Sequence, residues 1–424
     1  LEVRNGGTVQ LLGDNTYTGS TTVLTKYTST RDAQAAVDSN DSDLSVGGTY
    51  YEEVAPTLVV DKLSNGGVAS SIGAASSDAS NLFIQGSTLK YIGAGDNTNR
   101  LFTIGTGGAT IDASGAGAVV FSNTGALGRD DVEDKTGDID DFTGSPNELY
   151  NLSDTSDIIA GMTVTDPDAG GIGAPPVPRP IIPAGTTVTG VSDDGKTLGL
   201  SASYGFYLKA GTRLVFGTVP RTLTLSGSNG GDNTIASSIS NSAQGGVVGV
   251  TKTGAGTWVL TGANTYTGPT TVEQGTLKAV AMGGDLVANG GVVAPAVGVG
   301  TLGIGGDFTQ SSGAALAVDL ASASSFDVVT VTGDASLAGT VQVSLLGGFN
   351  PAVGASFDIL SASTLNIAGL SVSGPGGWSA TAIGNTLRLT RTALGSAIAA
   401  AVPEPSSAAL LVVALGGLFR RRRP

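Results

Sequence analysis

One polar phrase occurs twice in this chain, and it limits the possible folds more than any other feature. The sequence "GTVQLLGDNTYTGSTTV" at residues 7–23 aligns without a gap with "GTWVLTGANTYTGPTTV" at residues 256–272. A more divergent copy, "TLTLSGSNGGDNTIASSI", occupies residues 222–239. A repeated unit of this size cannot bury a core alone, so neighbouring units must stack on one another.

Within the repeat, apolar and polar residues alternate, and glycine and asparagine mark the turns. Trp258 and Leu260 lie two residues apart, as do Val9 and Leu11 in the first copy. Residues with this spacing share one face of a strand, and Gly-Ala-Asn or Gly-Asp-Asn then turns the chain. A second strand follows, and "QGTL" (274–277) starts a third. We therefore predict that four side chains point into a common core: Trp258, Leu260, Val272 and Leu277.

Composition agrees with an all-β fold. The chain has 424 residues, of which 66 are glycine and only 13% are charged. Short alternating segments rich in Thr, Ser and Val favour a parallel β-solenoid, or β-helix, over a sandwich or barrel.

Two residue types are absent, which excludes several kinds of chemistry. The sequence contains no Cys and no His. Disulfides, thiol nucleophiles, His-ligated zinc and imidazole acid–base catalysis are therefore excluded. The net charge of −14 makes nucleic acid an unexpected partner. An acidic surface with few charges and many Gly, Thr and Ser residues favours an extracellular protein.

The C-terminal segment 402–424, "VPEPSSAALLVVALGGLFRRRRP", has three parts. Pro403, Glu404 and Pro405 are stiff, residues 408–419 are apolar, and a basic cluster ends the chain. The apolar run is shorter than the roughly 20 residues that a membrane-spanning helix needs. However, flanking residues or local thinning can accommodate a short span. The cluster then acts as a membrane stop on the cytoplasmic side; it consists of Arg420, Arg421, Arg422 and Arg423.

This tail resembles the PEP-CTERM sorting signal of Gram-negative bacteria. The resemblance implies that Pro403, Glu404 and Pro405 form the sorting motif. It also implies an inner-membrane intermediate, which an exosortase processes before the protein reaches the cell surface or the extracellular space. Residue 1 is Leu, and no secretion signal precedes the first repeat, so we expect the sequence to be incomplete at its N-terminus.

The repeats resemble a second family. Residues 223–277, with the core "TKTGAGTWVLTGANTYTGPTTVEQGTL", are similar to the autotransporter-associated β-strand repeat, and residues 65–123 are similar to the coils that flank it. The resemblance implies a right-handed parallel β-helix that is exported and then displayed or released.

We expect six segments along the chain. Charge repulsion, proline and few large apolar residues suggest that residues 129–185 are the least ordered part of the body. The pattern of residues 186–201 predicts a hairpin that turns at Asp193, Asp194 and Gly195. The C-terminal helix is expected over residues 406–419, packed on nothing. The segments are 1–128, solenoid repeats; 129–220, an inserted acidic and proline-rich lobe; 221–280, repeats; 281–392, C-terminal coils that cap the stack; 393–401, a linker; and 402–424, the sorting signal.

No catalytic constellation is evident in the sequence. The acidic run 129–142 could bind Ca²⁺, but its spacing does not match an EF-hand, and a solvated acidic loop is the favoured interpretation. We expect Asn15 and Asn264 to form stacked ladders at a coil corner, and Tyr17 and Tyr266 to cover a turn. The calcium candidates are Asp134, Asp138, Asp140 and Asp141.

Three functions remain open. The favoured one is a non-catalytic surface or extracellular-matrix protein of a biofilm, similar to an adhesin, with no cofactor other than a possible Ca²⁺. The alternatives are a carbohydrate-binding β-helix and, less favoured, a polysaccharide lyase or hydrolase. Exopolysaccharide is the expected ligand class, and exosortase is the expected processing partner.

Overall fold

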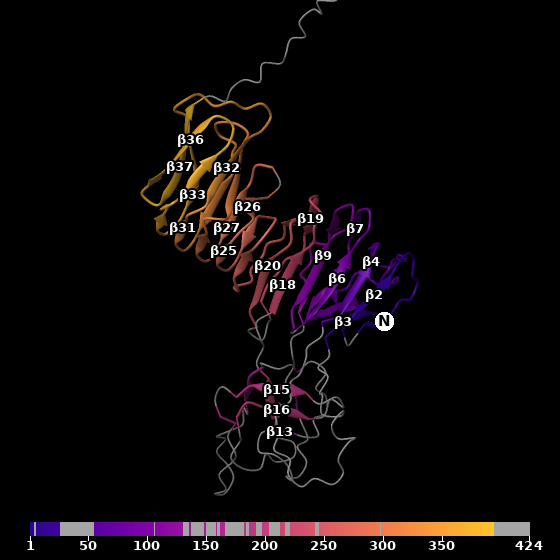
Figure 1. The fold of residues 1–424 in the computed structure, drawn as a ribbon. Helices are drawn as coiled ribbons and strands as arrows, with labels where there is room; N and C mark the ends of the chain where they lie inside the picture. Colours follow the sequence, from indigo (N-terminus) through magenta and orange to yellow (C-terminus); the bar gives the residue numbers. More distant parts are fainter. Residues whose placement is uncertain are drawn as a thin grey trace, which may run out of the picture.

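The computed structural model describes residues 1–3, 6–25, 55–105, 107–129, 221–241, 246–296 and 298–393, together with short segments between residues 135 and 216. Within these residues every regular element is a strand except the 3-10 turn Ala79–Asn81 (η1). Two long parallel sheets, of 11 and nine strands, run through the body, and two shorter sheets form a third face (Figure 1). The prediction of an all-β solenoid is therefore confirmed.

Before the terminal hairpin, each coil of the solenoid contributes at most one strand to each of three faces. Face 1 is a single 11-stranded sheet in which all pairs are parallel. Its strands, in spatial order, are β2 (Thr8–Leu11), β4 (Thr57–Val60), β6 (Ser87–Tyr91), β9 (Ala109–Ala113), β18 (Arg221–Ser226), β20 (Val248–Lys252), β22 (Thr270–Val272), β25 (Leu286–Ala288), β28 (Phe308–Gln310), β31 (Ala335–Leu337) and β34 (Leu365–Asn366).

Face 2 is a nine-stranded parallel sheet. Its strands are β7 (Asp96–Thr98), β10 (Val119–Phe121), β19 (Asp232–Ile235), β21 (Thr257–Leu260), β23 (Thr276–Ala279), β26 (Val292–Pro295), β29 (Ala315–Leu320), β32 (Thr340–Leu345) and β35 (Ser371–Ser373).

Face 3 is divided into two sheets. The first, in the N-terminal coils, is parallel and contains β1 (Glu2–Val3), β3 (Thr21–Leu24), β5 (Leu82–Gln85), β8 (Thr103–Ile104) and β11 (Gly128–Arg129). The second, in the C-terminal coils, contains β24 (Ala281–Met282), β27 (Thr301–Ile304), β30 (Val328–Val331), β33 (Ser356–Ser361), β37 (Thr386–Ala393) and β36 (Gly377–Ile383).

The core lies inside the coils, where in-register strands place apolar side chains in columns. Trp258 pairs with Leu277, and Leu260 pairs with Ala279. Trp258, Leu260, Val272 and Leu277 are each fully buried, which confirms their predicted inward direction. Burying one such side chain contributes about 1.5–3 kcal/mol, so stability comes from repeating this contact along the stack.

The two copies of the repeat lie on different faces. In the first copy the chain passes from β2 on face 1 to β3 on face 3, whereas in the second it passes from β21 on face 2 to β22 on face 1. Val9 pairs with the buried Leu58, so it belongs to an interior column. It is nevertheless 38% exposed, because β2 is the outermost described strand of face 1.

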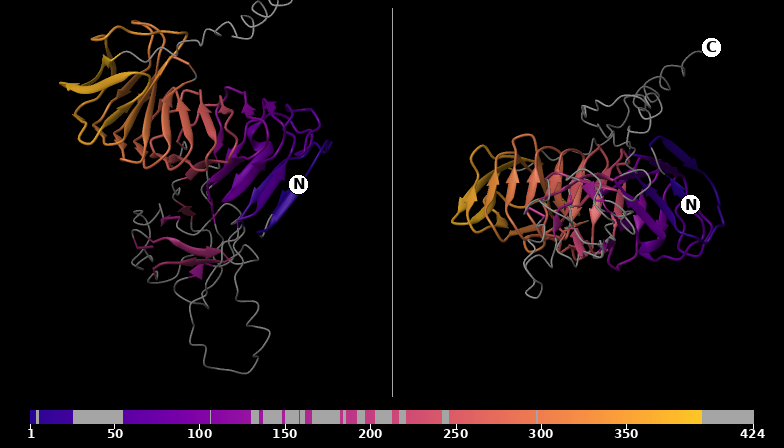
Figure 2. Two further views of the ribbon diagram at one scale, coloured as in Figure 1. Left: turned by 45° about the horizontal axis from the view of Figure 1, so that its top comes forward. Right: turned by 90° about the horizontal axis from the view of Figure 1, so that it is seen from below.

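Between β11 and β18 the chain leaves the solenoid. The described strands of this region are β12 (Lys135–Thr136), β13 (Glu148–Leu149), β14 (Val164–Thr165), β15 (Val188–Val191), β16 (Leu198–Leu200) and β17 (Arg213–Phe216). They form two small antiparallel sheets and enclose an apolar cluster of their own. Strands β15 and β16 pair antiparallel, as the predicted hairpin requires, and its turn residues 193–195 lie outside the described part of the chain. Figure 2 shows these strands to one side of the coils.

The C-terminal coils end in an antiparallel hairpin, β36–β37, which also pairs with β33. Phe357 contacts the rings of Phe326, Phe349 and Trp378 there. The buried Arg391 guanidinium lies 4.8 Å from the centroid of the Trp378 ring. Among the described residues no helix is long and apolar enough to cross a membrane. The helix expected over residues 406–419 lies outside that part of the chain, so it has no support here.

Candidate ligand-binding face

Most of the predicted site residues fall outside the described residues and stay predictions. They are the sorting motif Pro403, Glu404 and Pro405, the membrane stop Arg420, Arg421, Arg422 and Arg423, and the calcium candidates Asp134, Asp138, Asp140 and Asp141. Elsewhere, in the parts that are described, no group of three or more acidic side chains is arranged to hold a metal ion.

The repeated asparagine joins neighbouring coils. Asn264 Oδ1 accepts a hydrogen bond from the Ile239 backbone N–H at 3.0 Å, and its Nδ2 donates to the Ala281 carbonyl at 3.2 Å. In the first copy, Asn15 Nδ2 donates to the Ser71 carbonyl at 2.9 Å. The expected ladder of stacked asparagines is therefore wrong, because each amide bonds to the backbone of adjacent coils instead of another asparagine.

The repeated tyrosine forms the same contact in both copies. Tyr266 Oη lies 2.6 Å from Thr270 Oγ1, and Tyr17 Oη lies 2.8 Å from Thr21 Oγ1. Tyr266 is fully buried, and burial raises its pKa to about 12. In the second copy this aromatic ring is therefore a core residue that a sugar cannot reach.

A lysine inside the solenoid was missed by sequence reasoning. Lys252 follows Leu225 in an interior column of face 1 and is fully buried. Its Nζ donates to the carbonyls of Thr253 at 2.6 Å, Gly254 at 2.7 Å and Gln274 at 3.1 Å. Burial lowers its pKa to about 8. The available signal was its inward position in an alternating strand, next to a glycine turn.

Trp258 supplies another bond between coils, since its Nε1 donates to the Ser226 carbonyl at 2.8 Å. In the second copy these conspicuous residues hold coils together and are buried, so they offer no surface to a ligand. A binding surface has to be sought on the outward side of the sheets.

The outward side of face 1 carries one continuous row of residues, one from each strand. We call it the threonine row. No charged residue belongs to it, and the row passes from strand to strand in register. Neighbouring strands of a sheet lie about 4.8 Å apart, so the side chains repeat at that interval. The row consists of Thr8, Thr57, Thr88, Thr110, Thr224, Thr251, Thr271, Val287, Thr309, Ser336 and Asn366.

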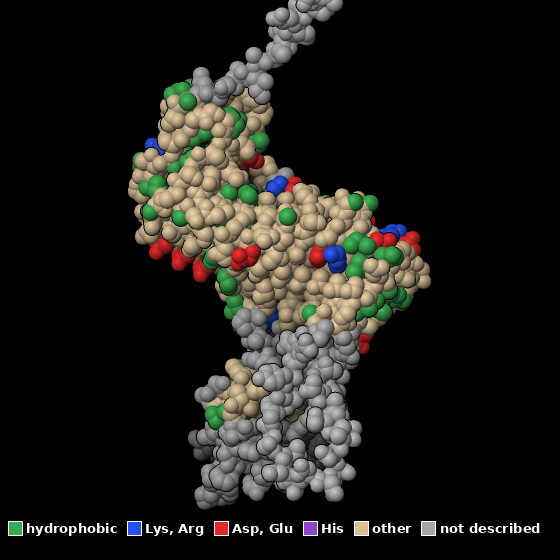
Figure 3. Space-filling model, in the orientation of Figure 1, with side chains coloured by type: hydrophobic (Ala, Val, Ile, Leu, Met, Phe, Trp, Pro, Cys, Tyr) green, Lys and Arg blue, Asp and Glu red, His purple; other side chains and the backbone are tan. Residues whose placement is uncertain are grey.

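The threonine hydroxyls of this row are available to a ligand. Every one of these threonines is at least partly exposed. No hydrogen bond joins their side chains to another described residue. Most of the solenoid surface visible in Figure 3 is likewise neither charged nor hydrophobic.

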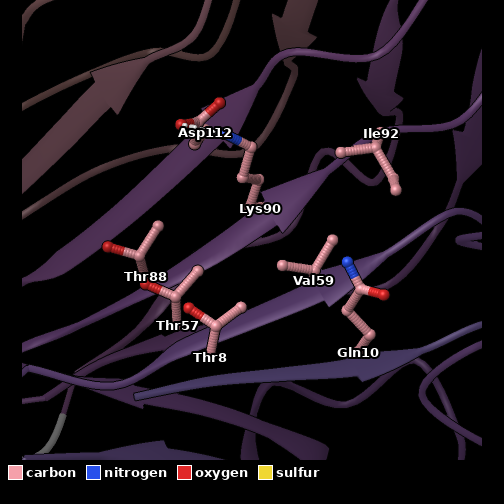
Figure 4. Close-up of a pocket in the computed structure, with 8 residues that line it drawn as sticks. All are labelled: Thr8, Gln10, Thr57, Val59, Thr88, Lys90, Ile92 and Asp112. Atoms are coloured by element: carbon pink, nitrogen blue, oxygen red, sulfur yellow. Dashed lines mark ion pairs between the residues drawn. The ribbon is translucent and has the colours of Figure 1, made fainter. Parts of the chain in front are cut away.

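A hollow of about 460 Å³ lies on the first part of the row. Thr8, Thr57 and Thr88 line one side of it. The next outward row contributes Gln10, Val59, Lys90 and Asp112, and Ile92 completes the lining (Figure 4). Lys90 Nζ lies 3.6 Å from Asp112 Oδ2, and both side chains are partly exposed. The hollow thus offers hydroxyl, amide, ammonium and carboxylate groups beside an apolar surface, a combination suited to binding a polar ligand.

Comparisons with known proteins agree with a stacked repeat scaffold. The passenger-associated-transport-repeat family matches residues 1–25 and 250–279, which contain the two copies of the phrase. The chain is also 33% identical over 222 residues to the adhesin BmaC autotransporter of Brucella suis biovar 1 (strain 1330). That match covers 52% of this chain and 4% of the relative, so the chain spans only a small part of that adhesin's length.

The chain therefore carries passenger-associated transport repeats and is similar to a segment of an autotransporter adhesin. These matches confirm the repeat resemblance found in the sequence. The resemblance of the tail to a PEP-CTERM signal stays a prediction.

Proposed function

We propose that this chain is part of a non-catalytic, exported adhesin-like protein that presents the outer faces of its solenoid at the cell surface or in the extracellular matrix of a biofilm. The observation that carries the proposal is the sequence similarity of this chain, which folds as a long parallel solenoid, to part of an adhesin, together with repeats whose polar residues join coils. A rigid, extended scaffold with a neutral outer face is suited to presenting many weak contacts at once.

The finer parts of the proposal rest on sequence resemblance and geometry. The solenoid is right-handed, since nearly all crossovers between parallel strands have that hand. The tail, with Pro403, Glu404 and Pro405 as its motif, directs exosortase processing from an inner-membrane intermediate. Arg420–Arg423 stay on the cytoplasmic side until that step.

The test uses the full chain behind a secretion leader in an exosortase-bearing Gram-negative host. Surface exposure is measured by accessibility to an antibody on intact cells, and adhesion is measured as cells retained on a biofilm-coated surface. We expect exposure and adhesion from the intact chain. Deletion of residues 402–424 should release the protein to the periplasm, and replacing Pro403, Glu404 and Pro405 by Ala should leave it membrane-bound and uncleaved. A chain that stays inside the cell, or that is exposed without promoting adhesion, would contradict the proposal.

A carbohydrate-binding module is the second candidate, favoured by the hollow on face 1. It differs from a polysaccharide lyase or hydrolase by leaving the glycan intact. Size-exclusion chromatography of a glucan before and after incubation separates the two, since only an enzyme would shorten the chain.

A further inference from the structure

We propose that the threonine row and its hollow form a binding track for a linear, uncharged, extended polysaccharide whose chain runs along the solenoid axis, across the strands. This inference rests on the proposed function and adds the ligand class and the residues that contact it.

The first argument is periodicity. The row presents a hydroxyl at nearly every strand because the sheet is parallel and in register from β2 to β31. The interval of about 4.8 Å is the spacing of strands in a sheet. An extended glycan also repeats its hydroxyl groups at a short, regular interval along one direction. Hydroxyls of successive sugars can therefore meet threonines of the row, so that many weak contacts add up along the chain.

The second argument is the chemistry of the side chains. A threonine hydroxyl both donates and accepts hydrogen bonds, as sugar hydroxyls do, and its methyl group can contact the C–H groups of a sugar ring. None of the threonine hydroxyls in the row is used by another described residue. Binding a glycan would therefore break no bond within the described parts.

The third argument is charge. The row itself contains no charged residue, and beside it Lys90 and Asp112 face each other at 3.6 Å. The whole chain has a net charge of −14, which repels a polyanion at low salt. A neutral glycan fits this surface better than an acidic one.

The hollow adds a place where the chain can be held more firmly. Gln10 offers an amide, Lys90 offers an ammonium group and Asp112 offers a carboxylate, all next to Thr8, Thr57 and Thr88. Ile92 is 37% exposed and supplies apolar contact at the same site. Sites of this kind combine an apolar surface with a few polar groups that fix the orientation of a ligand.

The shape of the stack favours a flexible occupant. The coils from β25 onward incline away from the line of the earlier coils (Figures 1 and 2). A flat, rigid partner, such as the sheet of a second copy, cannot touch the whole length of a bent row. A linear glycan can follow it.

The experiment measures retardation of the purified full chain in native gels that contain hydroxyethylcellulose, a neutral glucan, with alginate as the acidic comparison. Thr57→Lys changes the hollow, and Thr309→Lys changes the exposed row far from the hollow. Thr330→Lys is the matched control, because Thr330 is an exposed strand threonine on face 3. Thr309→Ser keeps the hydroxyl, and thermal melting establishes that each variant is folded.

We expect hydroxyethylcellulose to retard the chain and alginate to have little effect. Thr57→Lys and Thr309→Lys should each weaken the apparent affinity by about tenfold or more, while Thr309→Ser and Thr330→Lys bind as the unchanged chain does. The proposal is overturned if neutral glucan does not retard the chain, or if the Thr330→Lys control loses as much affinity as the row variants. The proposal is also overturned if the row variants leave glucan binding unchanged and alter only the sedimentation of the free protein. The row would then be an interface between two copies of the chain.

The failure of this inference can be told apart from the failure of the proposed function. Cells that display the chain and adhere normally with Thr57→Lys and Thr309→Lys would exclude the track as the adhesive surface and leave the adhesin-like function standing. A chain that never reaches the cell surface would refute the function itself.

Discussion

Replacement of Arg100 should loosen the loop formed by residues 64–76, which contacts the first copy of the repeat. Arg100 is 2% exposed. Its guanidinium donates to the carbonyls of Ser64, Ala75 and Gly73, each at 2.9 Å. Weaker contacts at 3.3–3.5 Å reach Val68, Asn65 and Ser76. Burial lowers the pKa of Arg100, so the site carries a desolvation cost that these carbonyls offset.

The loop held in this way contacts the first copy of the repeat. The Ala74 N–H donates to the Tyr17 carbonyl at 2.7 Å, and the Ser71 carbonyl accepts from Asn15 Nδ2 at 2.9 Å. Losing Arg100 should therefore loosen residues 64–76 together with the turn that follows β2.

The size of the effect follows from the three short bonds. A hydrogen bond to a charged group contributes about 1.5–3 kcal/mol, so three bonds give an upper limit of about 4.5–9 kcal/mol. Removing the guanidinium also removes its desolvation cost, which is several kcal/mol for a buried ion. We expect Arg100→Met to destabilise the loop by about 2–4 kcal/mol. Arg100→Lys should destabilise it by less, because Lys keeps the positive charge and three of the donors.

Hydrogen exchange measured by mass spectrometry tests this directly, because each 1.4 kcal/mol of local stability is about a tenfold change in protection. Protection of peptides within 64–76 should fall by about 30- to 700-fold in Arg100→Met, with coils 285–345 unchanged. Arg388→Met is the control, since Arg388 is an exposed partner of Asp358 at 2.6 Å, and exposed ion pairs contribute little to stability. Equal protection of residues 64–76 in the two variants would refute the reasoning.

Three further predictions concern the core. Leu260→Ala should cost about 2–5 kcal/mol in chemical denaturation; a loss below about 1 kcal/mol would mean that the column collapses around the gap. Burial lowers the folded pKa of Lys252 from 10.5 to about 8, so burying its charged form costs stability below pH 8, and this cost disappears as pH rises to 10.5. The unchanged chain should therefore gain stability relative to Lys252→Met as pH rises from 8 to 10.5, and parallel pH profiles would contradict this. Burial raises the pKa of Asp327 from 3.8 to about 6, so the stability that its protonated form provides is fully present below pH 3.8 and is lost as pH rises to 6. The denaturation midpoint of the unchanged chain should therefore fall relative to that of Asp327→Asn between pH 3.8 and 6. A constant difference between the two midpoints would exclude the titration.

The sequence by itself determined the strands and the direction of their side chains. Period-two alternation and glycine turns are local properties, so Trp258 and Leu260 could be placed in the core from their spacing alone. Repetition of the unit then required stacking, because one unit buries too little apolar surface. The hairpin at β15–β16 followed from turn chemistry in the same way.

Only the tertiary structure decided which residues meet across coils. The two copies of the phrase begin on different faces, the first with β2 on face 1 and the second with β21 on face 2. The face of a copy depends on how the preceding strands are distributed over the coils. The partners of Lys252 and Arg100 are backbone carbonyls, and they include Gln274 for Lys252 and Ala75 for Arg100, both distant in sequence. Carbonyls are present at every residue, so no sequence pattern singles these out.

The threonine row shows the same limit most clearly. Thr8, Thr57 and Thr309 belong to different coils, and many other threonines alternate in the same way. What selects them is the register between strands, which depends on the length of every intervening loop and on the packing of the interior columns. Pairing of the strands in space is therefore what turns scattered residues into one continuous surface.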